Sequence, residues 1–164
     1  MFAINEKVVY PGHGVATVDR LIDKRVACAS TMFYELVFVN KDMTILVPVS
    51  NSATIGVRKL SSVADIAQIF AIIGEPASER NFTTACASSW NKRSKNYQCK
   101  IRSGDLFEIA KIYRDLHHIA TKKELSFGER NLLQQTEALL AEEISLVYTI
   151  DTESAIEKLR QALI

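Results

Sequence analysis

The sequence predicts an α+β protein, in which a small β-barrel of the Tudor or SH3 type (residues 1–60) precedes a compact bundle of about five helices (residues 61–164). Three observations support this class. Apolar and polar residues alternate in the first part, as in half-buried strands. Turn residues interrupt that alternation about every ten residues. In the second part, apolar residues recur three and four positions apart, as on one face of a helix.

Four segments of the first part have the composition of strands. Each is rich in β-branched or aromatic residues and ends at a turn: residues 7–10, 15–22, 33–39 and 43–47. Four or five short strands are too few for a sandwich of two sheets, so a strongly bent barrel is the better fit. A barrel of this kind is expected to recognise a partner rather than to catalyse a reaction.

The first turn contains Gly12 and Gly14, which we expect to supply positive φ angles. A Gly-x-Gly pair after a strand also occurs in dinucleotide-binding turns. In this chain Thr17 stands where the third glycine of that motif would be, and a strand follows in place of a helix. The sequence therefore predicts no nucleotide cofactor.

The second part contains helix start and stop signals. Two capping boxes, in which a serine is followed three positions later by an acid, each predict the start of a helix: Ser62 with Asp65, and Ser126 with Glu129. Breaks are expected at the Gly-Glu-Pro of residues 74–76 and at the Ser-Gly-Asp of residues 103–105. A second helix is thus expected over about residues 79–100, and a last helix begins at Asp151.

Trp90 is the only tryptophan, and it precedes a basic stretch without any acid. Residues 91–102 carry five positive charges, although the whole chain has a formal net charge of only +1. These cations are Lys92, Arg93, Lys95, Lys100 and Arg102. A flat aromatic side chain beside a cluster of cations suits nucleic acid, which offers phosphates and rings that stack. The near-neutral total charge predicts weak binding to DNA unless a partner holds the protein in place.

Two interpretations of this segment remain open. On a helical wheel Arg93 lies on the same side as Trp90, whereas Lys92 and Lys95 lie on the far side. A lone tryptophan often packs in a core or at a domain interface, and a basic run is often only a solvated helix face. The alternative to nucleic-acid binding is therefore a protein–protein adaptor, in which Trp90 packs between the two halves and never contacts DNA.

Residues that could carry catalysis are poorly placed for it. His117 and His118 are adjacent, so their side chains point about 100° apart and cannot share a metal ion. We expect one of them to be half-buried and the other solvated. Glu142 and Glu143 are expected to lie side by side on a solvated helix face. The sequence predicts no metal, no cofactor and no enzyme; a small hydrolase or transferase with a spatially assembled site is the remaining alternative.

Nothing in the sequence indicates a membrane or an oxidising compartment. The apolar runs are far shorter than the roughly 20 residues that span a bilayer. The first residues lack the features of a secretory signal. The three cysteines are far apart and include no Cys-x-x-Cys pair. We expect a cytoplasmic protein with no membrane partner.

Several segments, taken in order along nearly the whole chain, resemble the CarD/CdnL family of bacterial transcription regulators that bind RNA polymerase. VVYPGHGVA at residues 8–16 is similar to the opening of the polymerase-interacting module, which also occurs in the transcription-repair coupling factor. WNKRSKN at residues 90–96 is similar to the segment that contacts promoter DNA. The other matching segments are VPV (47–49), IGVR (55–58), SGD (103–105), RDL (114–116) and LSFGER (125–130).

The resemblance implies a Tudor-like barrel that docks on the β subunit of RNA polymerase, through strand pairing at an exposed sheet edge. It implies a helical bundle that contacts promoter DNA at the upstream edge of the transcription bubble and stabilises the open complex. Trp90 would act there as a wedge, with Lys92, Arg93 and Lys95 on phosphates. A monomer is expected, with a domain-swapped dimer as the alternative.

One position departs from the family. Many relatives carry a basic residue just before the Val-Pro of the polymerase-facing strand, whereas this chain has Leu46. We therefore expect its polymerase contact to use Lys24 or Arg25, together with Leu46 and Pro48 from that strand. The predicted function is that of a non-enzymatic transcription regulator.

Overall fold

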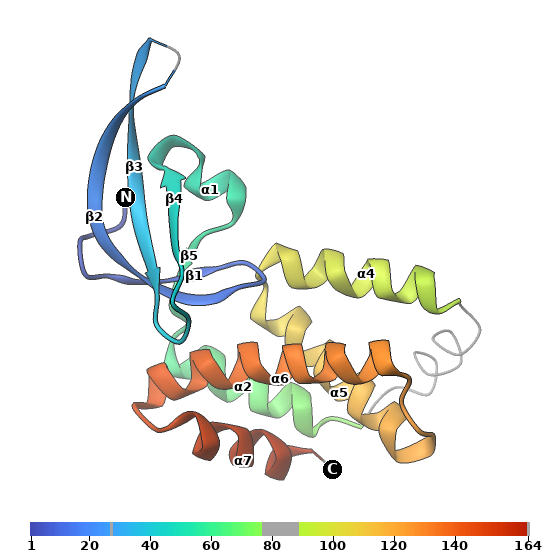
Figure 1. Ribbon diagram of the computed structural model, residues 1–164. Coiled ribbons are helices and arrows are strands. Elements are labelled where there is room, and N and C mark those ends of the chain that lie inside the picture. Colours follow the sequence, from blue (N-terminus) through green and yellow to red (C-terminus); the bar gives the residue numbers. More distant parts are fainter. Residues whose placement is uncertain (27, 77–88, 164) are drawn as a thin grey trace. The chain divides into compact units, whose positions relative to one another are not determined.

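The computed structural model describes residues 1–26, 28–76 and 89–163 (Figure 1). The chain forms two compact units, Met1–Leu60 and Ser61–Ile164. The first unit holds the strands and the second is helical. The α+β class predicted from the two periodicities is therefore confirmed.

The first unit is built on a five-stranded antiparallel sheet with the order β4-β3-β2-β1-β5. The strands are β1 (Lys7–Tyr10), β2 (Gly14–Val26), β3 (Ala29–Phe38), β4 (Thr44–Pro48) and β5 (Arg58–Lys59), and the short helix α1 is Ser52–Ile55. Alternate residues of the strands pack on one face, as the sequence pattern predicts. Their buried cluster is Val8, Ala16, Val18, Tyr34, Leu36, Phe38, Val47 and Val57.

The β2–β3 hairpin is longer than its sequence indicates, because β2 continues through Val26 and β3 begins at Ala29. Charged residues at 23–25 interrupt the apolar alternation, and the expected strand therefore stopped at Ile22. Cross-strand pairing continues the ladder beyond that point, and the hydroxyl of Ser30 donates a hydrogen bond to the carboxylate of Asp23. The hairpin extends well past the rest of the sheet (Figure 1).

The turn between β1 and β2 uses its two glycines as predicted. Gly12 has a φ of 74° and Gly14 has a φ of 107°, and both angles lie in the left-handed region that favours glycine. The turn lets Tyr10 pair directly with Gly14, so β1 and β2 form a tight hairpin.

The second unit contains five helices in its described residues, which confirms the expected bundle. They are α2 (Val63–Gly74), α4 (Trp90–Ser103), α5 (Leu106–Lys122), α6 (Phe127–Tyr148) and α7 (Thr152–Ala162). Both predicted capping boxes are present, at the starts of α2 and α6. The buried cluster is Ile66, Ile69, Ile73, Tyr97, Ile101, Leu106, Ile109, Ala110, Ile112, Tyr113, Leu116, Leu132, Leu140, Ala141, Ile144, Ala155 and Leu159.

The expectation of one helix over residues 79–100 is wrong at its start. α4 begins at Trp90, because Ser89 has an extended ψ of 146° and is the N-cap residue. The Ser89 side chain makes no capping hydrogen bond, so the start of α4 is marked by the extended backbone at this residue. The part of the expected helix that falls on residues 79–88 lies outside the described residues. Trp90 is therefore the first residue of a helix and not a residue of its middle.

Two expectations about solvation are also wrong. Glu142 and Glu143 are buried, and Glu143 is only 1% exposed. α6 packs against α2, α5 and α7. All six residues from 140 to 145 are buried, which indicates that this part of α6 is covered on several sides. Glu143 accepts a hydrogen bond of 2.9 Å from the backbone N–H of Ser61. His117 and His118 are both partly buried, and burial lowers the pKa of His117.

Candidate functional site

Trp90 lies at the surface of the helical unit, with one side against protein. It is partly buried and packs against the apolar core as the first residue of α4. Its indole lies directly on the first turn of α6, because a Cβ atom added at Gly128 would be only 2.7 Å from Cζ2 of the indole. Only a residue without a side chain leaves room for the ring at that distance.

Arg93 follows one turn later on α4 and contacts the same ring. Its guanidinium carbon is 5.7 Å from the centre of the indole, within the range of a cation–π interaction. Its Nη2 is 3.4 Å from Oε1 of Glu129 on α6. The Arg93 side chain is 13% exposed and that of Glu129 is 2% exposed, so this ion pair is largely shielded from water.

Glu129 connects three segments of the helical unit. Its Oε2 accepts a hydrogen bond of 2.9 Å from the backbone N–H of Ser126, and its Oε1 is 3.4 Å from Nζ of Lys123. Burial alone would raise the pKa of Glu129, but hydrogen bonds from Ser126 and the charge of Lys123 outweigh it and lower the pKa below its usual value. Glu129 is therefore an anion at neutral pH, and it can hold Arg93.

Lys92 and Lys95, the other two predicted phosphate ligands, lie on the exposed side of α4. Within the described residues, neither ammonium has a hydrogen-bond or ion-pair partner. The structure thus separates the three predicted cations. Arg93 is ion-paired and largely buried against the indole, whereas Lys92 and Lys95 are exposed and can bind an anion from solvent. This division agrees with the helical wheel.

Two residues near Trp90 were missed by sequence reasoning. Phe127, the first residue of α6, is 80% exposed, and it is adjacent in the chain to the Gly128 on which the indole lies. Arg130 is exposed two positions after Gly128, and its Nη2 donates to the carbonyl of Leu125. An aromatic residue directly after the capping serine, where a helix start is exposed, is the signal that could have indicated Phe127.

A second candidate surface lies in the first unit at strand β4. This strand is at the end of the sheet and pairs only with β3 in the described part of the chain. The bond from Phe38 N to Met43 O makes Phe38 and Met43 a hydrogen-bonded pair. Because such pairs alternate with open pairs along an antiparallel ladder, the backbone N–H and C=O of Leu46 point away from β3.

Pro48 occupies another open pair, opposite Phe33. A proline has no N–H to donate, and it fits an edge strand at such a position. Leu46 lies opposite Glu35, which pairs in turn with Arg20 on β2. The cation in the cross-strand row of Leu46 is therefore Arg20, which sequence reasoning did not select.

Lys24 and Arg25 are exposed on the hairpin, opposite Thr31 and Ser30. Pro48 lies opposite Phe33 on β3, and Phe33 lies opposite Ile22 on β2. Lys24 is two residues beyond Ile22 along β2. Strands rise about 3.3 Å per residue, which places Lys24 about 7 Å beyond Ile22. The four predicted polymerase-binding residues thus belong to one sheet but form two separate groups, one at the edge and one on the hairpin.

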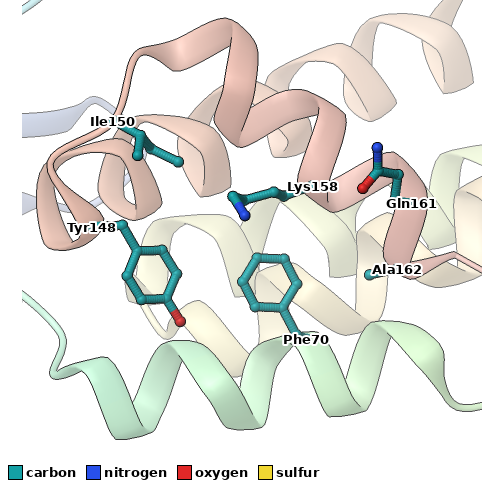
Figure 2. Close-up of a pocket in the computed structure, with 6 residues that line it drawn as sticks. All are labelled: Phe70, Tyr148, Ile150, Lys158, Gln161 and Ala162. Carbon is teal, nitrogen blue, oxygen red and sulfur yellow. The ribbon is translucent and has the colours of Figure 1, made fainter.

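The helical unit also contains a cavity of about 580 Å³ between α2, the end of α6 and α7. Figure 2 shows the rings of Phe70 and Tyr148 side by side, with Lys158 directed toward them. The other lining residues are Ile150, Gln161 and Ala162, so the described lining includes no acid, histidine, serine or cysteine. The described residues contain no cluster of three or more metal-ligating side chains, and no described helix could cross a membrane.

Comparison with known proteins identifies both units. Residues 68–160 match the family model of the CarD C-terminal domain, and residues 2–61 match that of the CarD-like/TRCF RID domain. The chain belongs to the CarD family. It is similar to the candidate transcription factor YdeB of Bacillus subtilis (strain 168), with 26% identity over 157 residues that cover 96% of this chain and 98% of YdeB. It is a CarD-family transcription factor, and its first unit is a Tudor-like domain.

Proposed function

We propose that this CarD-family protein binds the β subunit of RNA polymerase and stabilises the open promoter complex. In this proposal strand β4 pairs with a strand of the polymerase, and the Trp90 surface contacts DNA at the upstream edge of the bubble. The observation that carries the proposal is the position of the indole. An aromatic ring is held at the surface at the start of α4, and the same helix exposes Lys92 and Lys95, which have no ion-pair partner among the described residues. This combination suits distorted DNA better than it suits a protein core.

The docking part rests on the edge of the sheet. Leu46 directs a backbone donor and acceptor outward, so a polymerase strand can extend the ladder without disturbing β3. Pro48 ends β4 and limits that pairing to a few residues. Lys24 and Arg25 on the hairpin, and Arg20 in the row of Leu46, supply cations that can orient the partner by its acidic groups.

The DNA part rests on charges and aromatic groups at the start of α4 and α6. Trp90 and Phe127 can pack against exposed bases, while Lys92 and Lys95 can neutralise phosphates. Such a surface reads the shape of parted DNA and makes few base-specific hydrogen bonds. The near-neutral charge of the chain fits this arrangement, because the polymerase supplies the local concentration of DNA.

The energetic requirement is a higher affinity for melted than for closed promoter, because only a difference in affinity shifts that equilibrium. Stacking of an aromatic side chain on a base contributes about 1–3 kcal/mol. If this contact exists only in the melted state, it prolongs the open complex roughly 5- to 150-fold. A single wedge is therefore sufficient for a measurable regulatory effect.

The test is the lifetime of open complexes formed by purified polymerase, measured after addition of a DNA competitor. The native protein is expected to prolong the lifetime, and Trp90→Ala is expected to lose most of that effect. Trp90→Phe keeps a smaller ring and is expected to keep part of it. Equal lifetimes with native protein and Trp90→Ala would refute the wedge.

A second candidate function is that of an adaptor between proteins. The partial burial of Trp90 against the helical core favours it, since a ring of this kind can also anchor a protein interface. In that case Trp90→Ala would weaken binding to the polymerase itself and leave the lifetime of preformed, fully loaded complexes unchanged. Measurement of binding and lifetime with the same variant therefore separates the two functions.

A further inference from the structure

We propose that Arg93 is a positioning residue, which fixes the orientation of the Trp90 indole, and that it does not bind a DNA phosphate. The consequence for promoters rests on the function proposed above. The orientation itself is a property of the free protein, and it can be tested without polymerase or DNA.

The indole is held by protein on two sides. The backbone of Gly128 supports one part of the ring, and the guanidinium of Arg93 lies over it at 5.7 Å. Trp90 and Arg93 are three residues apart on α4, so a helix brings them to the same side. Together these contacts restrict the two side-chain torsions of the tryptophan, which would otherwise turn freely at a helix start.

Arg93 is itself held by Glu129, and leaving that partner would be costly. Glu129 is almost completely buried, and loss of its neighbour at 3.4 Å would leave the buried carboxylate with Lys123 as its only cation among the described residues. Nε and Nη1 of Arg93 are buried and have no partner among the described residues, so an external phosphate cannot reach them unless the side chain moves. Lys92 and Lys95 are exposed and can contact an external phosphate without such a movement.

A fixed ring matters because a wedge binds only in one orientation. When only a fraction of molecules holds the competent orientation, the apparent affinity falls by that fraction. A cation–π contact changes the ratio of competent to other indole orientations by a factor of roughly 2 to 30, depending on how well the contact is shielded from water. Arg93 would thus raise the share of molecules whose indole is ready to enter the DNA.

The first experiment uses the free protein, since its single tryptophan makes fluorescence a direct report on Trp90. Arg93→Lys keeps the charge but loses the flat guanidinium, and Glu129→Gln keeps an acceptor for the capping box but loses the charge. Both variants are expected to show lower residual anisotropy and stronger quenching by acrylamide. Lys95→Gln, an exposed site on the same helix, is the matched control and should behave as the native protein does.

The second experiment separates positioning from phosphate binding. Affinity for the polymerase–promoter complex is measured over a series of salt concentrations, because each phosphate contact adds about 0.9 to the slope of log affinity against log salt. Lys95→Gln is expected to reduce the slope by about that amount. Arg93→Gln is expected to lower affinity roughly 2- to 30-fold with the slope unchanged.

Each result is decisive. Native anisotropy in both Arg93→Lys and Glu129→Gln, with the circular dichroism of the folded protein, would overturn the positioning role, and so would a reduced slope with Arg93→Gln. Failure of Trp90→Ala to shorten open-complex lifetime would refute the proposed function instead. The fluorescence result would remain valid in that case, so the two failures are distinguishable.

Discussion

Substitution of Gly128 by alanine should separate stability from function. The new methyl group would lie 2.7 Å from Cζ2, 3.1 Å from Cε2 and 3.3 Å from Nε1 of Trp90. Ordinary contacts between such atoms are about 3.5–4.0 Å, so the edge of the indole must retreat by about 1 Å. The ring lies at the surface and can move, so the displacement falls on the indole and not on the backbone of α6.

The same substitution should leave the free energy of unfolding unchanged or raise it. Alanine is favoured over glycine in a helix by up to about 1 kcal/mol, and Gly128 has no left-handed φ that would oppose the change. Loss of half of a stacking energy of about 1–3 kcal/mol would nevertheless shorten open complexes roughly 2- to 12-fold. The variant should therefore be at least as stable as the native protein and yet less active.

The assay combines thermal unfolding, acrylamide quenching of Trp90 and the lifetime of open complexes. Gly74→Ala is the matched control, because a Cβ there would lie 3.4 Å from the carbonyl oxygen of Ala162 and would have no tryptophan atom within 4 Å. Native quenching and native lifetime with Gly128→Ala would refute the reasoning. A large loss of stability would also refute it, since the clash would then involve the backbone.

Two further predictions concern other parts of the chain. Leu46→Pro removes an outward-facing N–H and should abolish retention of the folded protein by a polymerase β-subunit fragment, whereas Ile45→Pro removes an inward-facing N–H and should unfold the sheet. Hydrogen bonds from Lys100 and Lys111 lower the pKa of Glu108 to about 2, so this carboxylate stabilises the fold above about pH 4.5, and the contribution disappears as the pH falls toward 2. Solvent screening limits it to about 0.5–1 kcal/mol, and the unfolding free energies of Glu108→Gln and native protein should differ by that amount at pH 7 and converge near pH 2.

Local patterns in the sequence determined much of the fold. The change from strands to helices was predictable, because the alternation of apolar residues in the first part and their spacing of three and four in the second each extend over many residues. The two capping boxes located the starts of α2 and α6. The length of the β2–β3 hairpin was not visible, since its polar outer part is held by cross-strand pairing and not by burial. The burial of Glu143 depends on the helices around α6, which no local pattern reveals.

The candidate site was predictable only within one helix. The wheel placed Arg93 beside Trp90, and the structure has this contact. Glu129 and Gly128 are more than thirty positions away in the chain, so their contacts with α4 depend on how the helices pack. The sequence signal at this place was a capping box, which explains why Glu129 begins a helix but not why it holds an arginine.

The open edge of β4 has a consequence for the free protein at high concentration. If this edge pairs with a polymerase strand as proposed, it offers the same backbone groups to a second copy of this chain. Self-association and docking would then exclude each other, because one edge takes one strand. A pair formed edge to edge through β4 uses that edge in both copies, so it closes as a dimer. Dilution would then favour the monomer, and an excess of polymerase would compete for the β4 edge and dissociate the dimer.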